Sequence, residues 1–170
     1  KLVLIPAPID YGIKFLINNT EISANIDNVV STIRGTNLFK NNISIMTVEH
    51  LLSALYALEI DNIKIKMSEI EVPILDGTSQ NFLNKILDVG IKEQDKKRME
   101  FIVNEFISFK SSKGIQFYLL PSKESIFTYH LNYKNIDILN QEFSITLKDT
   151  HYQNEVAFCK TFCLLSELLD

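Results

Sequence analysis

Cysteine is scarce in this sequence, and long apolar runs are absent. Only two cysteines occur in 170 residues, and Cys159 and Cys163 lie four positions apart, a spacing that fits neither a disulfide framework nor a zinc ribbon. A reducing, cytoplasmic setting is therefore expected. No apolar run approaches the ~18 residues of a membrane helix, and no cationic segment precedes an apolar one as in a secretory leader. We therefore predict no membrane span.

The sequence also has no excess of basic charge, which argues against nucleic acid as a partner. Its 17 basic residues are outnumbered by 21 acidic residues, for a net charge of −4, so a large basic surface is not expected. With 46% hydrophobic and 22% charged residues, the composition is typical of a globular protein. The sequence begins at Lys1 rather than at a methionine, and we expect the natural N-terminus to lie upstream.

The first half of the chain predicts an α+β fold. Short runs of β-branched and apolar residues between turn residues indicate strands. Apolar residues at helical spacing predict two helices, and Gly90 stands where a helix C-cap glycine belongs. An Asp-Gly turn precedes the second helix, for which Thr78 or Ser79 is the expected N-cap. The expected strands span 2–5, 12–18, 22–26, 43–45 and 62–67, the expected helices span 47–59 and 79–89, and segment 30–42 is expected to form strands and a loop.

A charged segment divides the sequence into two halves. Six of the seven residues in 92-KEQDKKR-98 are charged, which predicts a linker. The order of strands, helices, linker, strands and helix indicates α+β rather than alternating strands and helices. We therefore predict two similar α+β domains, each a sheet packed against helices: 1–91, and 99–170 as the N-terminal part of an incomplete second domain. In the second half we expect strands at 99–109, 114–121, 125–133 and 141–147, and then a mainly helical 150–170, with a short strand over 158–163 as the alternative.

The stretch 46-MTVEHLLSALYALEIDN-62 places an acid and an imidazole side by side at the start of a helix. In the first interpretation these are solvated end residues, since the helix dipole favours an acid in the first turn. In the second, His50 is a zinc ligand, and Glu49 takes the proton from a water that zinc activates. Successive helical residues point about 100° apart, so Glu49 could flank a metal held by His50. The pair alone leaves both interpretations open.

Several blocks of the sequence together resemble one enzyme family. They are TVEHLLSAL (47–55), IDNIKIKM (60–67), EVPILDGTSQNF (71–82), the opening LIPAPIDYGIKF (4–15) and CKTFC (159–163). These blocks resemble the zinc-dependent UDP-3-O-acyl-N-acetylglucosamine deacetylases of lipid A synthesis, in the order found in that family. The resemblance implies a hydrolase that removes the N-acetyl group from a UDP-linked acylated glucosamine.

The resemblance also assigns roles to individual residues. It implies that His50 is a zinc ligand and that Glu49 is the general base. It implies that Thr161 binds or polarises the reacting group, and that Phe162 lines the substrate site together with Lys160. It further implies two similar α+β domains with the active site between them, in a protein that we expect to be monomeric.

The sequence departs from the family pattern at several points. Lys160 stands where the family has arginine, which keeps the charge but loses the planar fork. Asn81 replaces a proline. Two later parts of the family pattern have no counterpart here. One is the His-Lys…Asp block, which supplies two further zinc ligands in the family, and the other is a histidine that serves as the acid. We therefore expect the remaining zinc ligands to lie outside this chain and the 170-residue chain alone to be inactive.

The remaining features favour structural roles. We interpret His130 and His151 as surface or hydrogen-bonded histidines, the two cysteines as small core residues, and Asp76 as a turn residue. Aromatic residues at strand spacing are expected to form the core face of a sheet: Phe101, Phe106, Phe109, Phe117, Tyr118 and Phe127. The competing functional class is a non-catalytic α+β binding or interaction domain, which includes a truncated or degenerate homologue without activity.

Overall fold

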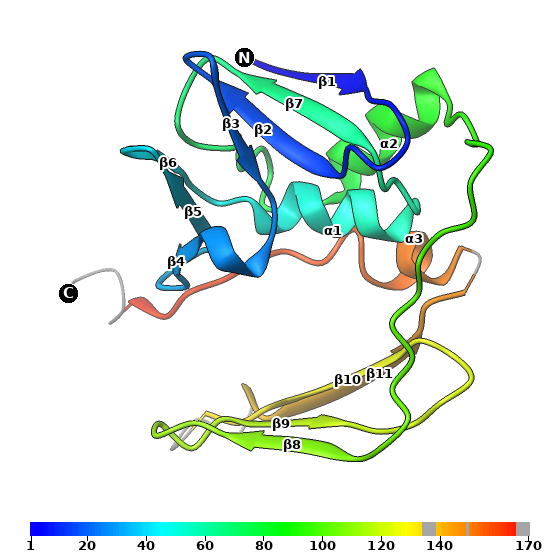
Figure 1. Ribbon diagram of the computed structural model, residues 1–170. Helices are drawn as coiled ribbons and strands as arrows, with labels where there is room; N and C mark the ends of the chain where they lie inside the picture. The colour runs from blue at the N-terminus through cyan, green and yellow to red at the C-terminus, as the bar shows by residue number, and fades with distance from the viewer. Residues whose placement is uncertain (134–138, 149, 166–170) are drawn as a thin grey trace. The chain divides into compact units, whose positions relative to one another are not determined.

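The computed structural model describes residues 1–133, 139–148 and 150–165, and it has the α+β composition expected from the sequence (Figure 1). The chain forms two compact units. Unit 1 comprises Lys1–Lys96 and Gln153–Asp170, and unit 2 comprises Lys97–Tyr152. The domain boundaries predicted from the sequence, 1–91 and 99–170, stay a prediction; the compact units divide the chain differently. No helix in the described part of the chain is both long and apolar enough to cross a membrane.

A four-stranded sheet forms the base of unit 1. It contains β1 (Leu2–Pro6), β7 (Ile63–Met67), β2 (Ile13–Ile17) and β3 (Thr20–Ser23), in that order. Strands β2 and β7 are parallel, and the two outer pairs are antiparallel. Because side chains alternate along a strand, this register puts one apolar set on the same face: Phe15, Ile17, Ile22, Ile63, Ile65 and Met67, all buried.

A smaller antiparallel sheet follows in the chain. A 3₁₀ turn (Ile26–Asn28) precedes β4 (Val29–Ser31), β5 (Asn37–Lys40) and β6 (Ile43–Ile45). Asn41 and Asn42, between β5 and β6, have φ values of 51° and 61°. Positive φ at both central residues defines the type I′ turn, and asparagine tolerates this conformation well. This turn sequence therefore explains the tight β5–β6 hairpin inside the segment expected to be strand and loop.

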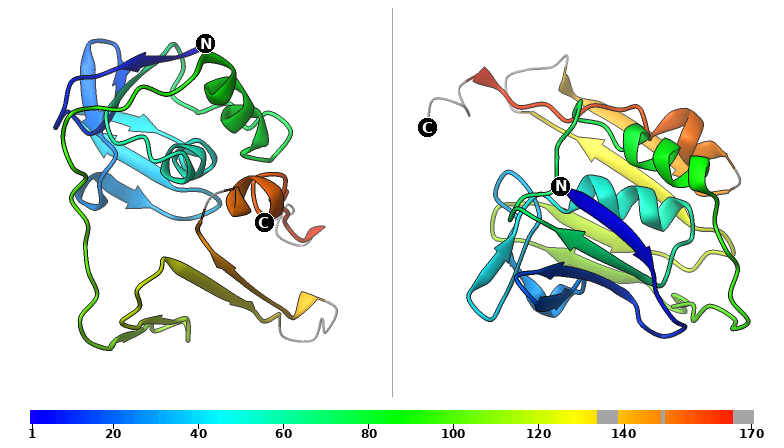
Figure 2. Two further views of the ribbon diagram at one scale, coloured as in Figure 1. Left: turned by 90° about the vertical axis from the view of Figure 1, so that its right-hand side faces the viewer. Right: turned by 90° about the horizontal axis from the view of Figure 1, so that it is seen from above.

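Helices α1 (Glu49–Ala57) and α2 (Gln80–Val89) lie on the same face of the four-stranded sheet (Figures 1 and 2). Both match the expected helices to within two residues at each end. Gly90 ends α2 with a φ of 81°. Ser79 occupies the N-cap position without a side-chain capping bond, and the Thr78 hydroxyl instead accepts the Gln80 N–H at 3.2 Å. The helices bury Val48, Leu51, Ala54, Leu55, Phe82, Leu83 and Ile86.

The charged segment predicted as a linker is held to unit 1 in its first part. The Lys96 ammonium pairs with the Asp10 carboxylate at 2.6 Å. The Gln94 side chain accepts a hydrogen bond from Asn62 at 2.7 Å and donates one to the Ala7 carbonyl at 3.0 Å. The chain therefore leaves unit 1 only after Lys96. The first strand of unit 2 begins at Ile107, later than the expected residue 99.

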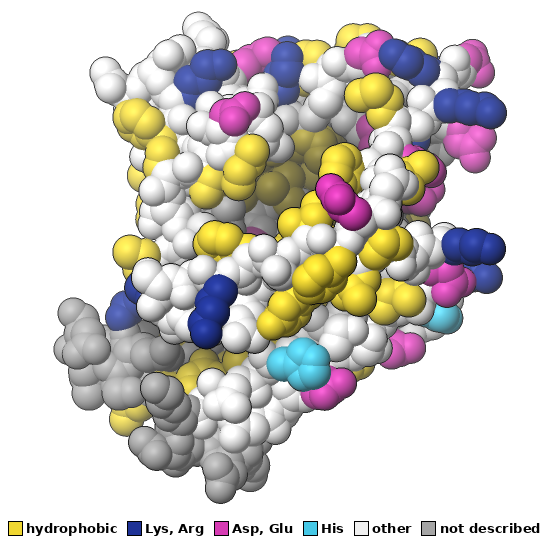
Figure 3. All heavy atoms as spheres, turned by 60° about the horizontal axis from the view of Figure 1, so that its bottom comes forward, with side chains coloured by type: hydrophobic (Ala, Val, Ile, Leu, Met, Phe, Trp, Pro, Cys, Tyr) yellow, Lys and Arg dark blue, Asp and Glu magenta, His cyan; other side chains and the backbone are white. Residues whose placement is uncertain are grey.

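Unit 2 contains two antiparallel strand pairs. Strand β8 (Ile107–Lys110) pairs with β9 (Gln116–Leu119), and β10 (Ile126–Leu131) pairs with β11 (Gln141–Thr146). The prediction that the aromatic residues form a buried face is wrong, because two-stranded pairs offer little surface to cover a face. Hydrophobic side chains are visible on the surface in Figure 3. Each of the six aromatic residues expected to form this face is more than half exposed: Phe101, Phe106, Phe109, Phe117, Tyr118 and Phe127.

The C-terminal segment is less helical than expected. Helix α3 (His151–Glu155) is short, and residues 159–164 form neither helix nor strand. The last five residues of the predicted helical stretch, 166–170, lie outside the described residues. Both cysteines are exposed free thiols. The prediction that they are core residues is therefore wrong, because the helix that would have buried them ends before it reaches them.

We expect the buried centre of the four-stranded sheet to control stability. Ile65 is fully buried on β7, whereas Ile33 is 79% exposed. Ile65→Ala should lower the free energy of unfolding by about 2–5 kcal/mol, because it removes buried methylene groups and leaves a cavity. The matched variant Ile33→Ala should change it by less than about 0.5 kcal/mol. Urea unfolding measures both values, and equal losses would contradict this assignment of the core.

Candidate active site

Glu49 and His50 lie together at the first turn of α1. One carboxylate oxygen of Glu49, Oε2, accepts the backbone N–H of Thr36 at 2.8 Å. The other, Oε1, lies 4.0 Å from His50 Nε2. The His50 side chain is 14% exposed and that of Glu49 is 37% exposed. The carboxylate is therefore oriented by the backbone on one side and faces the imidazole on the other.

The imidazole of His50 has few polar contacts. Within the described residues it makes no hydrogen bond, and the Glu49 carboxylate lies 4.0 Å from its Nε2. No side-chain nitrogen or oxygen among the described residues is both buried and without a partner, so the ring nitrogens of His50 are accessible to solvent or to a ligand. In the described part of the chain, however, no three His, Cys, Asp or Glu side chains form a group able to hold a metal ion. His50 is thus a single potential ligand.

A loop that sequence reasoning did not single out holds the head of α1. Thr36, just before β5, also accepts the Val48 N–H through its carbonyl at 3.2 Å. The Asn37 side chain accepts the Thr47 N–H at 3.2 Å, and the Thr47 hydroxyl donates to Glu71 at 2.8 Å. Thr47 has a φ of 59°, which is rare for a β-branched residue and occurs where surrounding contacts enforce it. The head of α1 is therefore fixed from two sides.

The Asp-Gly turn before α2 is organised by Asp76. A single oxygen of this carboxylate, Oδ1, accepts the Thr78 hydroxyl at 2.8 Å, the Thr78 N–H at 3.3 Å and the Asn81 side-chain N–H at 2.9 Å. The hydroxyl of Thr78, with the Thr78 backbone and Asn81, lowers the pKa of the Asp76 carboxyl below its ordinary value of 3.8. Asn81 thus takes part in the turn through its side chain.

The same turn holds the segment that contains the predicted substrate residues. The Thr161 N–H donates to the Gly77 carbonyl at 3.1 Å, and the Ser79 hydroxyl donates to the Ala157 carbonyl at 3.2 Å. Lys160, Thr161 and Phe162 are all exposed. Among the described residues they form no hydrogen bond or ion pair with Glu49 or His50. The structure thus places the predicted residues in unit 1, in two local groups.

The other two histidines have partners, as expected. His130 Nδ1 lies 3.2 Å from the Glu142 carboxylate across β10 and β11. His151 Nδ1 lies 3.0 Å from the Thr146 carbonyl. Both side chains are therefore accounted for by local contacts, and the interpretation as surface or hydrogen-bonded histidines is confirmed.

Comparison with known proteins finds one family over nearly the whole chain. The family of UDP-3-O-acyl N-acetylglycosamine deacetylases matches residues 1–169. The chain is 38% identical over 168 residues to the bifunctional enzyme LpxC/FabZ of Chlorobaculum tepidum, covering 96% of this chain and 36% of the relative. It is 32% identical to the UDP-3-O-acyl-N-acetylglucosamine deacetylase of Aliarcobacter butzleri, covering 99% and 56%. For the enzyme of that name from Hahella chejuensis the identity is 35%, covering 98% and 57%. The chain thus spans 36% to 57% of the length of these relatives.

The hydrogen bonds to Asp76 predict how stability depends on pH. Because its pKa is lowered in the folded state, the ionised carboxylate stabilises the fold above the unfolded-state pKa, and this contribution is lost as pH falls through the folded-state pKa. Asp76→Asn should therefore be less stable than the wild type near neutral pH, and the difference should shrink below about pH 4.

Thermal unfolding between neutral and acidic pH measures the difference. Asp27→Asn is the control, because Asp27 is exposed and has no hydrogen bond to its side chain within the described residues. Stability curves of the wild type and Asp76→Asn that stay parallel through the acid range would count against this role for the Asp76 carboxylate.

Proposed function

Because the chain belongs to the UDP-3-O-acyl N-acetylglycosamine deacetylase family, we propose that the protein containing it removes the N-acetyl group from UDP-3-O-acyl-N-acetylglucosamine, an early committed step of lipid A synthesis. The observation that carries this proposal is the family match over residues 1–169. The Glu-His pair at the head of α1 supports it. A binding domain unrelated to this family would leave the match over residues 1–169 unexplained.

We propose that Glu49 is the general base. A base must approach the proton that it abstracts with its carboxylate correctly directed. The Thr36 N–H holds Oε2 and leaves Oε1 toward His50. An arrangement of this kind lets one oxygen accept a proton from a water beside His50 while the other keeps the side chain in place. The exposed fraction of the Glu49 side chain gives solvent and substrate access to it.

We propose that His50 is one ligand of a zinc ion. A neutral imidazole is a common zinc ligand, and the His50 ring has no competing hydrogen bond in the described residues. When bound, zinc supplies a Lewis acid and a water of lowered pKa. A catalytic zinc typically takes about three protein ligands, so the other ligands must come from outside the described residues. The 170-residue chain alone is therefore not expected to retain zinc or to deacetylate.

We propose that Lys160, Thr161 and Phe162 contact the substrate. Thr161 is held by the hydrogen bond from its backbone N–H to the Gly77 carbonyl. The Thr161 hydroxyl takes no part in that bond. Lys160 supplies a point charge rather than the planar fork of arginine, and Phe162 offers an exposed apolar ring. We further propose a cytoplasmic monomer that binds no nucleic acid, in which unit 2 belongs to a second α+β domain.

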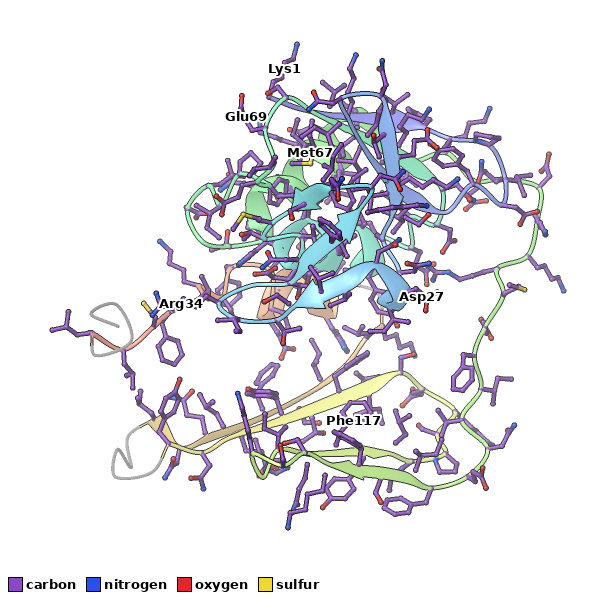
Figure 4. All side chains as sticks on the ribbon, turned by 60° about the vertical axis from the view of Figure 1, so that its left-hand side comes forward. Lys1, Asp27, Arg34, Met67, Glu69 and Phe117 are labelled. Atoms are coloured by element: carbon purple, nitrogen blue, oxygen red, sulfur yellow. The ribbon has the colours of Figure 1, made fainter. Side chains whose placement is uncertain are left out.

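Replacement of Glu49 tests the proposed reaction. In the whole protein that contains this chain, Glu49→Gln should keep zinc bound but lower turnover by about 10²-fold or more, the usual scale for a lost general base. The matched control is Glu69→Gln, because Glu69 is an exposed acid in the loop after β7 (Figure 4). Deacetylation of the UDP-linked substrate and zinc content are measured together. Near wild-type turnover in Glu49→Gln would refute its role as the base.

Replacement of Thr161 tests the substrate segment. Thr161→Ala keeps the backbone N–H that binds Gly77, so the melting temperature should change little while kcat/KM falls by about 10-fold, the scale of a lost hydrogen bond of about 1.4 kcal/mol. Activity and thermal unfolding are compared in the same preparation. A fall in melting temperature with unchanged activity would mark the Thr161 hydroxyl as structural.

A further inference from the structure

We propose that Gly35 and Thr36, in the loop between β4 and β5, are positioning residues that fix the carboxylate of Glu49 beside His50. The proposal rests on the proposed role of Glu49 as a base. It assigns a part in the reaction to two residues that have no titratable side chain and that lie in the segment 30–42, for which the sequence predicts only strands and a loop.

The backbone of Thr36 makes two hydrogen bonds to the head of α1, one with the Glu49 carboxylate and one with Val48. Its N–H donates to Glu49 Oε2 at 2.8 Å, and its carbonyl accepts the Val48 N–H at 3.2 Å. The first bond sets the direction of the side chain, and the second sets the start of the helix that contains it. Because both bonds use the main chain of one residue, the carboxylate and the helix cannot shift independently with respect to the loop.

Gly35 provides the space in which this carboxylate lies. A Cβ atom at position 35 would stand 3.3 Å from Glu49 Oε1, 3.8 Å from Glu49 Oε2 and 3.6 Å from the Thr47 hydroxyl. The first distance is shorter than ordinary van der Waals contact, so the carboxylate would have to move by a few tenths of an ångström, roughly the shortfall from a normal separation of about 3.5–4.0 Å. Oε1 is also the oxygen nearest to His50. Any side chain at position 35 would therefore press on Oε1, the carboxylate oxygen of Glu49 that faces His50.

The loop cannot easily retreat to accommodate a larger residue. Asn37 accepts the Thr47 N–H at 3.2 Å, and Thr47 in turn donates through its hydroxyl to Glu71 at 2.8 Å. Leu38, directly after Asn37, is buried in the core. With the loop held on the C-terminal side of Gly35, an added methyl group presses on the Glu49 carboxylate and also strains the backbone, because Gly35 has a φ of 155°. A misplacement of about 1 Å can lower a rate by about 10²-fold, so a smaller shift should still be measurable.

The test is a double-variant cycle in the whole protein that contains this chain. Gly35→Ala should lower kcat by about 10-fold with little change in KM, since it displaces a group used only in the reaction. In a Glu49→Gln background the same change should cost nothing further, because the group on which it acts is already absent. Gly90→Ala is the matched control: Gly90, like Gly35 with its φ of 155°, has a positive φ, of 81°, but a Cβ there would meet nothing within 4 Å.

The outcomes separate this proposal from the proposed function. A kcat loss in Gly35→Ala that disappears in the Glu49→Gln background supports the positioning role. Wild-type kcat in Gly35→Ala, or an equal further loss in both backgrounds, overturns it even when Glu49→Gln itself is inactive. If Gly35→Ala does not fold, Asn37→Ala is used in its place, because it removes the hydrogen bond from the Thr47 N–H to the Asn37 side chain without adding atoms. Its kcat is compared in the wild-type and Glu49→Gln backgrounds in the same way. An active Glu49→Gln would instead remove the base assignment on which the proposal rests.

Discussion

The packing of α1 against the four-stranded sheet fixes where Glu49 and His50 lie. Val48, Leu51, Ala54 and Leu55 are all fully buried, so the helix has one orientation with respect to the core. The same burial leaves its first turn at the edge of the core, where Glu49 and His50 keep part of their surface open. An apolar helix body thus supplies the rigid support that a site requires. The chemistry proposed for this protein depends on that packing.

Two segments from different parts of the chain complete the support. The loop before β5 and the first residue of β5 form hydrogen bonds with the head of α1 through Thr36 and Asn37. Glu71, at the start of the EVPILDG block, reaches Thr47 from the other side, and Met46 forms a β-bridge with Glu71. The same block continues into the Asp76 turn, whose Gly77 holds Thr161. One stretch of sequence therefore ties together both groups of residues that the family resemblance identifies.

The sequence predicted the parts of the fold that depend on local pattern. The two helices, Gly90 as the end of α2, and most strands of unit 1 follow from periodicity and turn residues. The Glu-His pair could be found from its place at a helix start. The contact of Thr36 with Glu49 could not, because a backbone N–H has no residue signature and the contact joins segments 13 positions apart. The only available signal was Gly35, a glycine inside a segment that otherwise indicates strands.

The errors share one physical cause. Alternation of Phe109 with polar neighbours shows that one face of a strand is apolar, but it does not show what covers that face. The helical spacing after Tyr152 likewise could not show that the helix stops at Glu155, which leaves both cysteines exposed. Pattern identifies an element and its faces, whereas burial depends on neighbours that are distant in the sequence.

Metal content tests most directly whether the head of α1 is part of a zinc centre, as proposed. The measurement is zinc per protein, by mass spectrometry after gel filtration, in the whole protein that contains this chain. His50→Ala should lose most of its zinc while its circular dichroism stays that of the wild type, because His50 makes no hydrogen bond within the described residues. His151→Ala, which removes a histidine bonded to the Thr146 carbonyl, should retain zinc. Full zinc content in His50→Ala would contradict the account.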